Sequence, residues 1–107
     1  MTVYVDSMRA KYGRLIMCHM IADIDAELRA MADKIGVKQK WHQGDHFDIC
    51  LAKRALAIKA GAVEITQRQA GAMTIRKRAT GSLGSSADAE QWLRDRVAAR
   101  HSEKATA

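Results

Sequence analysis

The segment Leu15–Ala22 constrains the fold more than any other part of the chain. Both of its alternating sets of positions are apolar apart from His19. One set contains Ile16, Cys18 and Met20, and the other contains Leu15, Met17, His19 and Ile21. Successive side chains of a β-strand point to opposite faces, so a strand that is apolar on both faces has to be covered on both. The segment therefore predicts a central strand in a sheet with other elements packed on each side.

Helices are predicted on both sides of the irregular stretch at residues 37–48. Asp23 is a suitable N-cap for a first helix, and Gly36 is a typical stop signal. The apolar residues between them recur at helical spacing, at Ile24, Leu28, Met31 and Ile35. A second helix carries Leu51, Ala55 and Ile58 on one face and ends at Gly61.

The remaining elements are shorter or lie nearer the C-terminus. Residues 3–6 and 62–65 read as strands, and residues 7–14 as a polar loop. Thr66 and Gln69 form a capping box that opens a third helix. A fourth helix has Trp92, Leu93 and Val97 on one stripe. We expect an α/β fold, with a small mixed or parallel sheet covered by helices and an appended C-terminal helix.

The length of 107 residues suits one domain with a single core. We expect a compact α/β domain at residues 1–78 and a flexible linker at residues 79–86, which hold two glycines and three serines. A C-terminal helix at residues 87–101 and a frayed tail at residues 102–107 would follow. Because the fourth helix follows a linker, its Trp92 and Leu93 could pack on a second copy, giving a homodimer, or on a partner such as a host protein. Packing back on its own domain is the ordinary outcome.

Charge and composition indicate which binding partners and which cell compartment suit this chain. The net charge of +6 favours nucleic acid, nucleotides or an acidic protein surface as partners. Met1 is followed by a strand-like segment and not by a basic stretch and a long apolar run, so we expect no secretion. No apolar stretch approaches the roughly 20 residues of a membrane helix. Cys18 and Cys50 are expected to be reduced thiols of a cytoplasmic protein.

Histidines and acids gather at residues 41–49, which contain two of the four histidines together with Asp45 and Asp48. Imidazole titrates near neutrality and is a common metal ligand, so this stretch is the first place to expect chemistry. Asp6 ends a predicted strand, where α/β folds leave crevices. We expect His19, His46 and Asp48 to converge with Asp6 there.

Two imidazoles and two carboxylates suit a divalent metal such as Mn²⁺ or Zn²⁺, which could activate water or polarise a phosphate. Without a metal, the same groups could act as general acid and base, while Lys53 or Arg54 holds an anionic substrate. The first hypothesis for function is therefore a phosphate-directed, phosphodiesterase-like or nuclease-like site at Asp6, His19, His46 and Asp48.

Each of these residues also has a purely structural interpretation. A histidine in an apolar strand, such as His19, is usually a core residue whose ring nitrogens are satisfied by a carboxylate or a carbonyl. Asp48 could simply cap the helix that begins near Leu51. His46 favours function more strongly, because it lies between acids on an irregular segment.

Other site types are disfavoured by spacing. A zinc knuckle from Cys18, His19, His42 and His46 has the right residue types, but neighbouring strand residues such as Cys18 and His19 point to opposite faces. No P-loop, dinucleotide fingerprint, zinc-protease motif or serine-triad signature occurs in the chain.

The second hypothesis is a non-catalytic module that binds nucleic acid or, as an inhibitor, a host protein. Residues 66–87 contain no acid. The basic side chains in this stretch that could contact phosphates are Arg68, Arg76, Lys77 and Arg78. A basic last helical turn also complements the helix macrodipole, so these charges have an equally simple structural role. This hypothesis predicts activity that survives the loss of His46.

Three short motifs occur in a familiar order: Val-Tyr-Val-Asp at 3–6, Cys-His-Met-Ile-Ala-Asp at 18–23 and His-Phe-Asp at 46–48. Over about residues 2–78 the chain resembles domain-of-unknown-function family 4031, small proteins of tailed phages and their bacterial hosts. The resemblance implies a shared fold, a phage-type accessory protein in the host cytoplasm, and shared polar positions at Asp6, His19, His46 and Asp48. It implies no particular activity.

Overall fold

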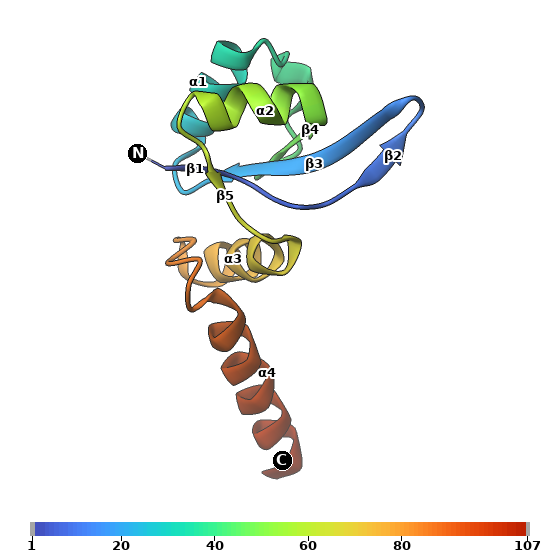
Figure 1. The fold of residues 1–107 in the computed structure, drawn as a ribbon. Helices are drawn as coiled ribbons and strands as arrows, with labels where there is room; N and C mark the ends of the chain where they lie inside the picture. The colour runs from blue at the N-terminus through green and yellow to red at the C-terminus, as the bar shows by residue number, and fades with distance from the viewer. Residues whose placement is uncertain (1, 107) are drawn as a thin grey trace.

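The computed structural model describes residues 2–106 and shows a mixed α/β fold, as the sequence predicts. Within these residues a five-stranded sheet combines antiparallel and parallel pairs, and helices pack on both of its faces (Figure 1). The strands are β1 Val3–Val5, β2 Ala10–Tyr12, β3 Leu15–Ala22, β4 Phe47–Cys50 and β5 Val63–Glu64. The helices are α1 Asp25–Ile35, α2 Leu51–Lys59, α3 Gln67–Thr80 and α4 Ala89–Thr106, with a short 3₁₀ turn η1 at Gln39–Trp41.

The strand β3 is the centre of the sheet, as its two apolar faces predict. Met20 faces Val5 of β1 across one edge and Phe47 of β4 across the other. Further along β3, Met17 lies between Ala10 of β2 and Cys50 of β4. β1 also pairs in parallel with β5, so the sheet is mixed. The polar residues Asp6, His19, His46 and Asp48, which form the site described below, lie on or directly beside these paired strands.

Two apolar clusters cover the two faces of the sheet. Cys18 and Met20 of β3 pack with Leu28 of α1 and Ala57 of α2 on one face. Ile21 packs with Met73 of α3 on the other. His19, being odd-numbered like Ile21, therefore points to the face that α3 covers.

Several sequence interpretations are corrected by the structure. Residues 10–12, expected in a loop, form β2, because they pair with β3 in a hairpin although all three are exposed. Residues 47–50 form β4 and not an irregular loop. Asp48 therefore does not cap α2, whose N-cap is Cys50. Asp23 does not cap α1 either: its Oδ1 accepts a hydrogen bond from the backbone N–H of Leu83 at 2.7 Å.

The C-terminal region continues from α3 by a short loop into α4. Residues 79 and 80 are the last residues of α3, and Leu83 in the following loop is buried against the α3 side of the sheet. Helix α4 packs on α3 through Ala89 and Leu93 and then projects from the body of the molecule (Figure 1). It runs through Thr106, beyond the residue at which the sequence predicts fraying. Among the described residues, no helix is both long and apolar enough to cross a membrane.

Candidate metal centre

His19 is held in place by Asp6, the residue that follows β1. The Nδ1 of His19 lies 2.8 Å from Oδ2 of Asp6, whose Oδ1 accepts the backbone N–H of His19, also at 2.8 Å. Asp6 is almost completely buried, at 1% exposure, and accepts a further bond from the N–H of Met8. With Asp6 on Nδ1, the other ring nitrogen, Nε2, is directed toward β4.

His46, directly before β4, is held in a similar way. Its Nδ1 lies 2.9 Å from Oδ1 of Asp45. The other oxygen of Asp45 accepts a hydrogen bond from Nε of Arg78 on α3, also at 2.9 Å. The chain Arg78–Asp45–His46 thus joins α3 to the edge of the sheet and leaves Nε2 of His46 free for another partner.

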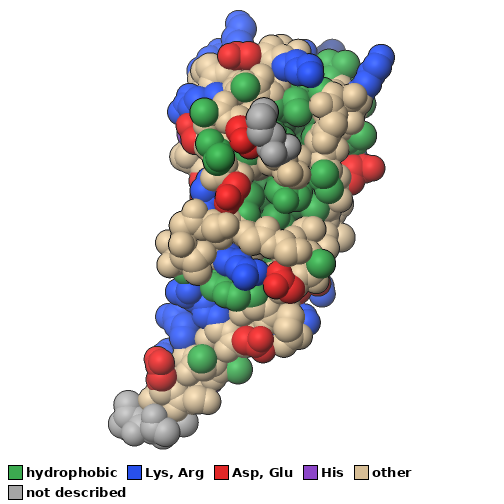
Figure 2. All heavy atoms as spheres, turned by 90° about the vertical axis from the view of Figure 1, so that its left-hand side faces the viewer, with side chains coloured by type: hydrophobic (Ala, Val, Ile, Leu, Met, Phe, Trp, Pro, Cys, Tyr) green, Lys and Arg blue, Asp and Glu red, His purple; other side chains and the backbone are tan. Residues whose placement is uncertain are grey.

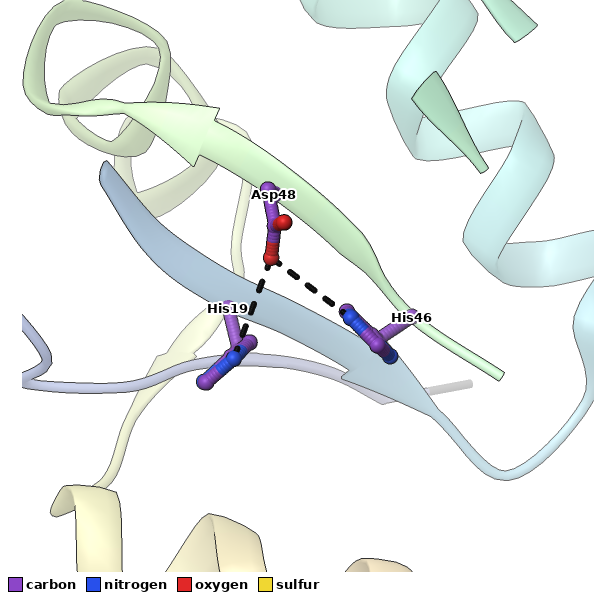
Figure 3. Close-up of side chains that lie close together, drawn as sticks. All are labelled: His19, His46 and Asp48. Atoms are coloured by element: carbon purple, nitrogen blue, oxygen red, sulfur yellow. Dashed lines mark ion pairs between the residues drawn. The ribbon is translucent and has the colours of Figure 1, made fainter. Parts of the chain in front are cut away.

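Both free Nε2 atoms face one carboxylate oxygen. Oδ1 of Asp48 lies 3.5 Å from Nε2 of His46 and 3.8 Å from Nε2 of His19. Figure 3 shows the Asp48 carboxylate between the two rings, which stand edge to face. This oxygen is buried and has no hydrogen-bond partner. One ligand atom from each of the three residues fits within 4.8 Å of the others, so the three could hold a metal ion.

Charge at the site favours ionised carboxylates. Burial raises the pKa of Asp6, but hydrogen bonds from the side chain and backbone of His19 outweigh it and leave the pKa below its usual value. The same side-chain bond raises the pKa of His19 against the opposing effect of burial. Burial also raises the pKa of Asp45, and bonds from His46 and Arg78 more than reverse this.

The cluster formed by His19, His46 and Asp48 borders a cleft between the sheet and α3. The cleft has a volume of about 360 Å³ and is lined by His19 and His46 on the sheet side. On the α3 side its wall includes Gly71, Thr74 and Arg78. A small molecule or part of a polymer that enters here would meet the imidazoles and the Arg78 guanidinium together.

Lys53 and Arg54, which the sequence suggests as anion-binding residues, lie in different surroundings. Nε of Arg54 donates to the carbonyl oxygen of Asp6 at 2.9 Å, and its Nη1 pairs with Glu64. Arg54 therefore ties α2 to the end of β1. Lys53 lines a different cleft, together with Trp41.

The basic residues of α3 have separate partners. Arg76 pairs with Asp88, and Lys77 donates to the carbonyl oxygen of Ala22. Arg78 pairs with Asp45, while Arg68 lies exposed in the first turn of α3. On the face drawn in Figure 2, Lys and Arg side chains are interspersed with Asp and Glu side chains along the molecule.

Cys18 and His42 lie away from the cluster. Cys18 is buried in the core on the opposite face of the sheet, where desolvation raises the pKa of its thiol to about 11. Nε2 of His42 lies 2.7 Å from Oδ1 of Asp25 on α1. A zinc knuckle that shares these residues with His19 is incompatible with this arrangement.

The chain matches the model of a known protein family. The model of the family described as "Protein of unknown function (DUF4031)" matches residues 3–78. The chain belongs to this family. No curated protein and no solved structure matches it. All the residues of the cluster, and Arg78, lie within the part of the chain that the family model covers.

The four residues expected to converge occupy different positions in the arrangement. Asp6, His19, His46 and Asp48 do come together, but Asp6 lies behind His19 and not beside the three converging atoms. The contact of Asp45 with His46 was missed, and the only signal for it was that the two are neighbours in sequence. The pairing of Arg78 with Asp45 joins residues 33 positions apart and had no sequence signal.

Proposed function

We propose that this protein is a metal-dependent, phosphate-directed hydrolase, of phosphodiesterase or nuclease type, whose ion is bound by His19, His46 and Asp48. The observation that carries the proposal is the buried Oδ1 of Asp48, which lacks a hydrogen bond and faces two imidazole Nε2 atoms. A buried polar atom without a partner is costly and calls for an explanation.

The hydrogen bonds outside the cluster set the tautomers. Because Asp6 and Asp45 are acceptors, each imidazole in its neutral form donates its Nδ1–H to a carboxylate and presents a lone pair at Nε2. Two nitrogen lone pairs and one carboxylate oxygen then converge, which is repulsive unless a cation lies between them. Carboxylate–histidine–metal arrangements of this kind orient ligands in many metal sites.

The donor set fits a divalent ion that retains open positions. Tetrahedral zinc with bonds of about 2.1 Å has ligand atoms about 3.4 Å apart, close to the separations of 3.5 and 3.8 Å around Asp48 Oδ1. Two imidazoles and one carboxylate suit Zn²⁺ or Mn²⁺. Three protein ligands are typical of catalytic sites, where a further position is left for water or substrate.

The surroundings support hydrolysis of a phosphate ester. A bound divalent ion lowers the pKa of coordinated water toward neutrality and neutralises charge on a phosphate oxygen. Arg78 lines the same cleft and is 67% exposed on its side chain, so its guanidinium is accessible to an anionic group beside His46. The net charge of +6 would attract a polyanionic substrate.

The test begins with metal binding. Elemental mass spectrometry of the untagged protein should find stoichiometric metal, or Mn²⁺ or Zn²⁺ should raise the unfolding temperature of chelator-treated protein. His46→Ala should abolish this stabilisation. His42→Ala is the matched control, because it removes an imidazole that pairs with Asp25 outside the cluster. Equal metal stabilisation of the wild type and His46→Ala would refute the site.

Catalysis is tested separately with bis(p-nitrophenyl) phosphate and with labelled oligonucleotides in the presence of each metal. Hydrolysis should require the metal and be lost in His46→Ala and Asp48→Asn. A metal-loaded protein that hydrolyses none of these substrates would keep the metal site and overturn the phosphodiesterase assignment. Activity that survives the loss of His46 would favour the non-catalytic binding module instead.

A further inference from the structure

A second cleft lies at the β4 edge of the sheet, separate from the cleft that His19 and His46 line. Its volume is about 370 Å³. Its walls come from the β2–β3 hairpin, the segment after α1 and the start of α2. In Figure 1 this hairpin extends well past the other strands, so it forms an arm at one side of the cleft.

Two aromatic and three basic side chains line this cleft, together with apolar residues. Tyr12 of the hairpin is 60% exposed, and its ring meets that of Trp41 edge to face at 6.1 Å. Lys40 places its ammonium 5.6 Å from the centre of the Trp41 ring. Lys38 and Lys53 complete the basic lining.

The charge of the cleft is one-sided. Asp48 is the one acid among the described residues that line it, against the three lysines. Lysine ammonium groups bind phosphates as point charges, and exposed aromatic rings provide faces on which bases of any sequence stack. An apolar partner protein would use the aromatic rings but would leave three lysine charges without counter-charges.

We infer that this cleft binds single-stranded nucleic acid, with a base stacked on Tyr12 beside Trp41 and the backbone phosphates neutralised by Lys38, Lys40 and Lys53. The inference does not need a metal. Asp48 lines this cleft and is also a member of the proposed metal centre. A bound strand would therefore run past the edge of that centre, and in this one respect the inference rests on the proposed function.

The test is fluorescence anisotropy with a labelled single-stranded oligonucleotide of about twenty thymidines, titrated with the full-length protein in excess chelator. Chelator prevents cleavage and makes the result independent of the metal centre. We expect saturable binding that Tyr12→Ala weakens by about tenfold or more and that Tyr12→Phe preserves. Lys40→Ala should weaken binding and reduce the slope of log K against log salt by about 0.7.

The controls separate the cleft from net charge and from the metal centre. Lys59→Ala removes an equal charge at the exposed end of α2 and should bind like the wild type. The excess chelator, present throughout, removes any contribution of the proposed metal centre. In a Trp92→Phe background the remaining Trp41 fluorescence should be quenched as the oligonucleotide saturates the cleft.

Three results would overturn the inference: no binding at low salt, equal losses in Lys40→Ala and Lys59→Ala, or unchanged affinity in Tyr12→Ala. Each of them would leave the metal stabilisation of the wild type untouched, so failure here differs from failure of the proposed function. If the oligonucleotide does not bind and the protein elutes as a dimer that Tyr12→Ala dissociates, the cleft is an interface between copies.

Discussion

The oxygen of Asp48 that faces both histidines sets opposing demands on stability and on metal binding. When no metal is bound and both imidazoles are neutral, three acceptor atoms converge there. Asp48→Asn removes the negative charge and supplies an amide N–H, which can donate a hydrogen bond to Nε2 of His19 or of His46. At a pH above the raised pKa of His19, we expect this variant to be more stable than the wild type by about 1 kcal/mol in chelator. Urea unfolding measures this difference, and the variant should also lose the stabilisation by metal.

Asp45→Asn is the informative comparison for this prediction. Asp45 accepts bonds from both His46 and Arg78, so its amide variant should lose stability where Asp48→Asn gains it. A metal-free Asp48→Asn protein that is less stable than the wild type would show that the acceptors do not repel one another.

The Asp6–His19 pair predicts how stability depends on pH in metal-free protein. The pKa of Asp6 lies below its usual 3.8, so its contribution is present above pH 3.8 and is lost as the pH falls through the lowered value. The pKa of His19 lies above its usual 6.5, so its contribution is present below pH 6.5 and is lost as the pH rises through the raised value. The pair thus stabilises the fold most between pH 3.8 and 6.5.

Asp6→Asn measures this contribution. Urea unfolding of wild type and variant across the pH range, in chelator, should give a difference in free energy that is largest inside that window and smaller on either side. A difference that stays constant from acid to alkaline pH would mean that Asp6 acts only through its shape and its neutral hydrogen bonds.

Residue types and local spacing predicted that these side chains lie close together, but not which of them converge and which lie behind. His46 and Asp48 lie two positions apart, so their closeness is readable from the sequence. Asp6 and His19 meet because Asp6 extends the β1–β3 ladder, with its N–H bound to the carbonyl oxygen of His19. That ladder depends on strand register, which no short-range pattern specifies.

At the level of elements, α3 forms one wall of the cleft that His19 and His46 line. Its N-terminus is stabilised by a capping box. The Oγ1 of Thr66 accepts the N–H of Gln69, and the Gln69 side chain accepts the N–H of Thr66. Thr66→Ala should lower the free energy of unfolding by about 1 kcal/mol, measured in urea, while Thr66→Ser should retain the wild-type value. Equal losses in both variants would place the effect in the methyl group.

The elements with strong periodicity and the short strands β1 and β5 were predictable, whereas β2 and β4 were not. The helix over Asp25–Ile35 and its stop at Gly36, which adopts a left-handed φ of 80°, follow from the sequence pattern. β2 is exposed at every position and has no alternation to reveal it. β4 has the alternation, with Phe47 and Ile49 buried, but an aspartate ahead of a helix is also a typical cap.

For the whole molecule, the C-terminal region divides at Leu93. Leu83 and Ala89 are buried against the α3 face of the core, whereas the described side chains beyond Leu93 are exposed. Removing residues 95–107 should change the free energy of unfolding by less than about 0.5 kcal/mol. Removing residues 81–107 should cost more than about 2 kcal/mol, since it uncovers Ile21 and Met73.

Urea unfolding of the two truncated chains measures both effects. This pair of chains also tests the predicted division into a domain at residues 1–78, a linker and a helix. A chain ending at residue 80 that is as stable as the full chain would support a compact unit that folds without the C-terminal helix.

The pairing of β3 with β4 has a consequence for folding kinetics. His19 lies opposite Asp48 in this antiparallel pair, and the 28 residues between them include all of α1. A slip of one residue in the pairing would turn one of the two side chains to the other face of the sheet. The side chains of His19 and Asp48 can therefore meet only after this long loop has closed in the correct register. Non-local pairings of this kind form slowly. If the proposed ion binds here, its uptake during refolding would consequently report the arrival of the native register, later than the formation of helices.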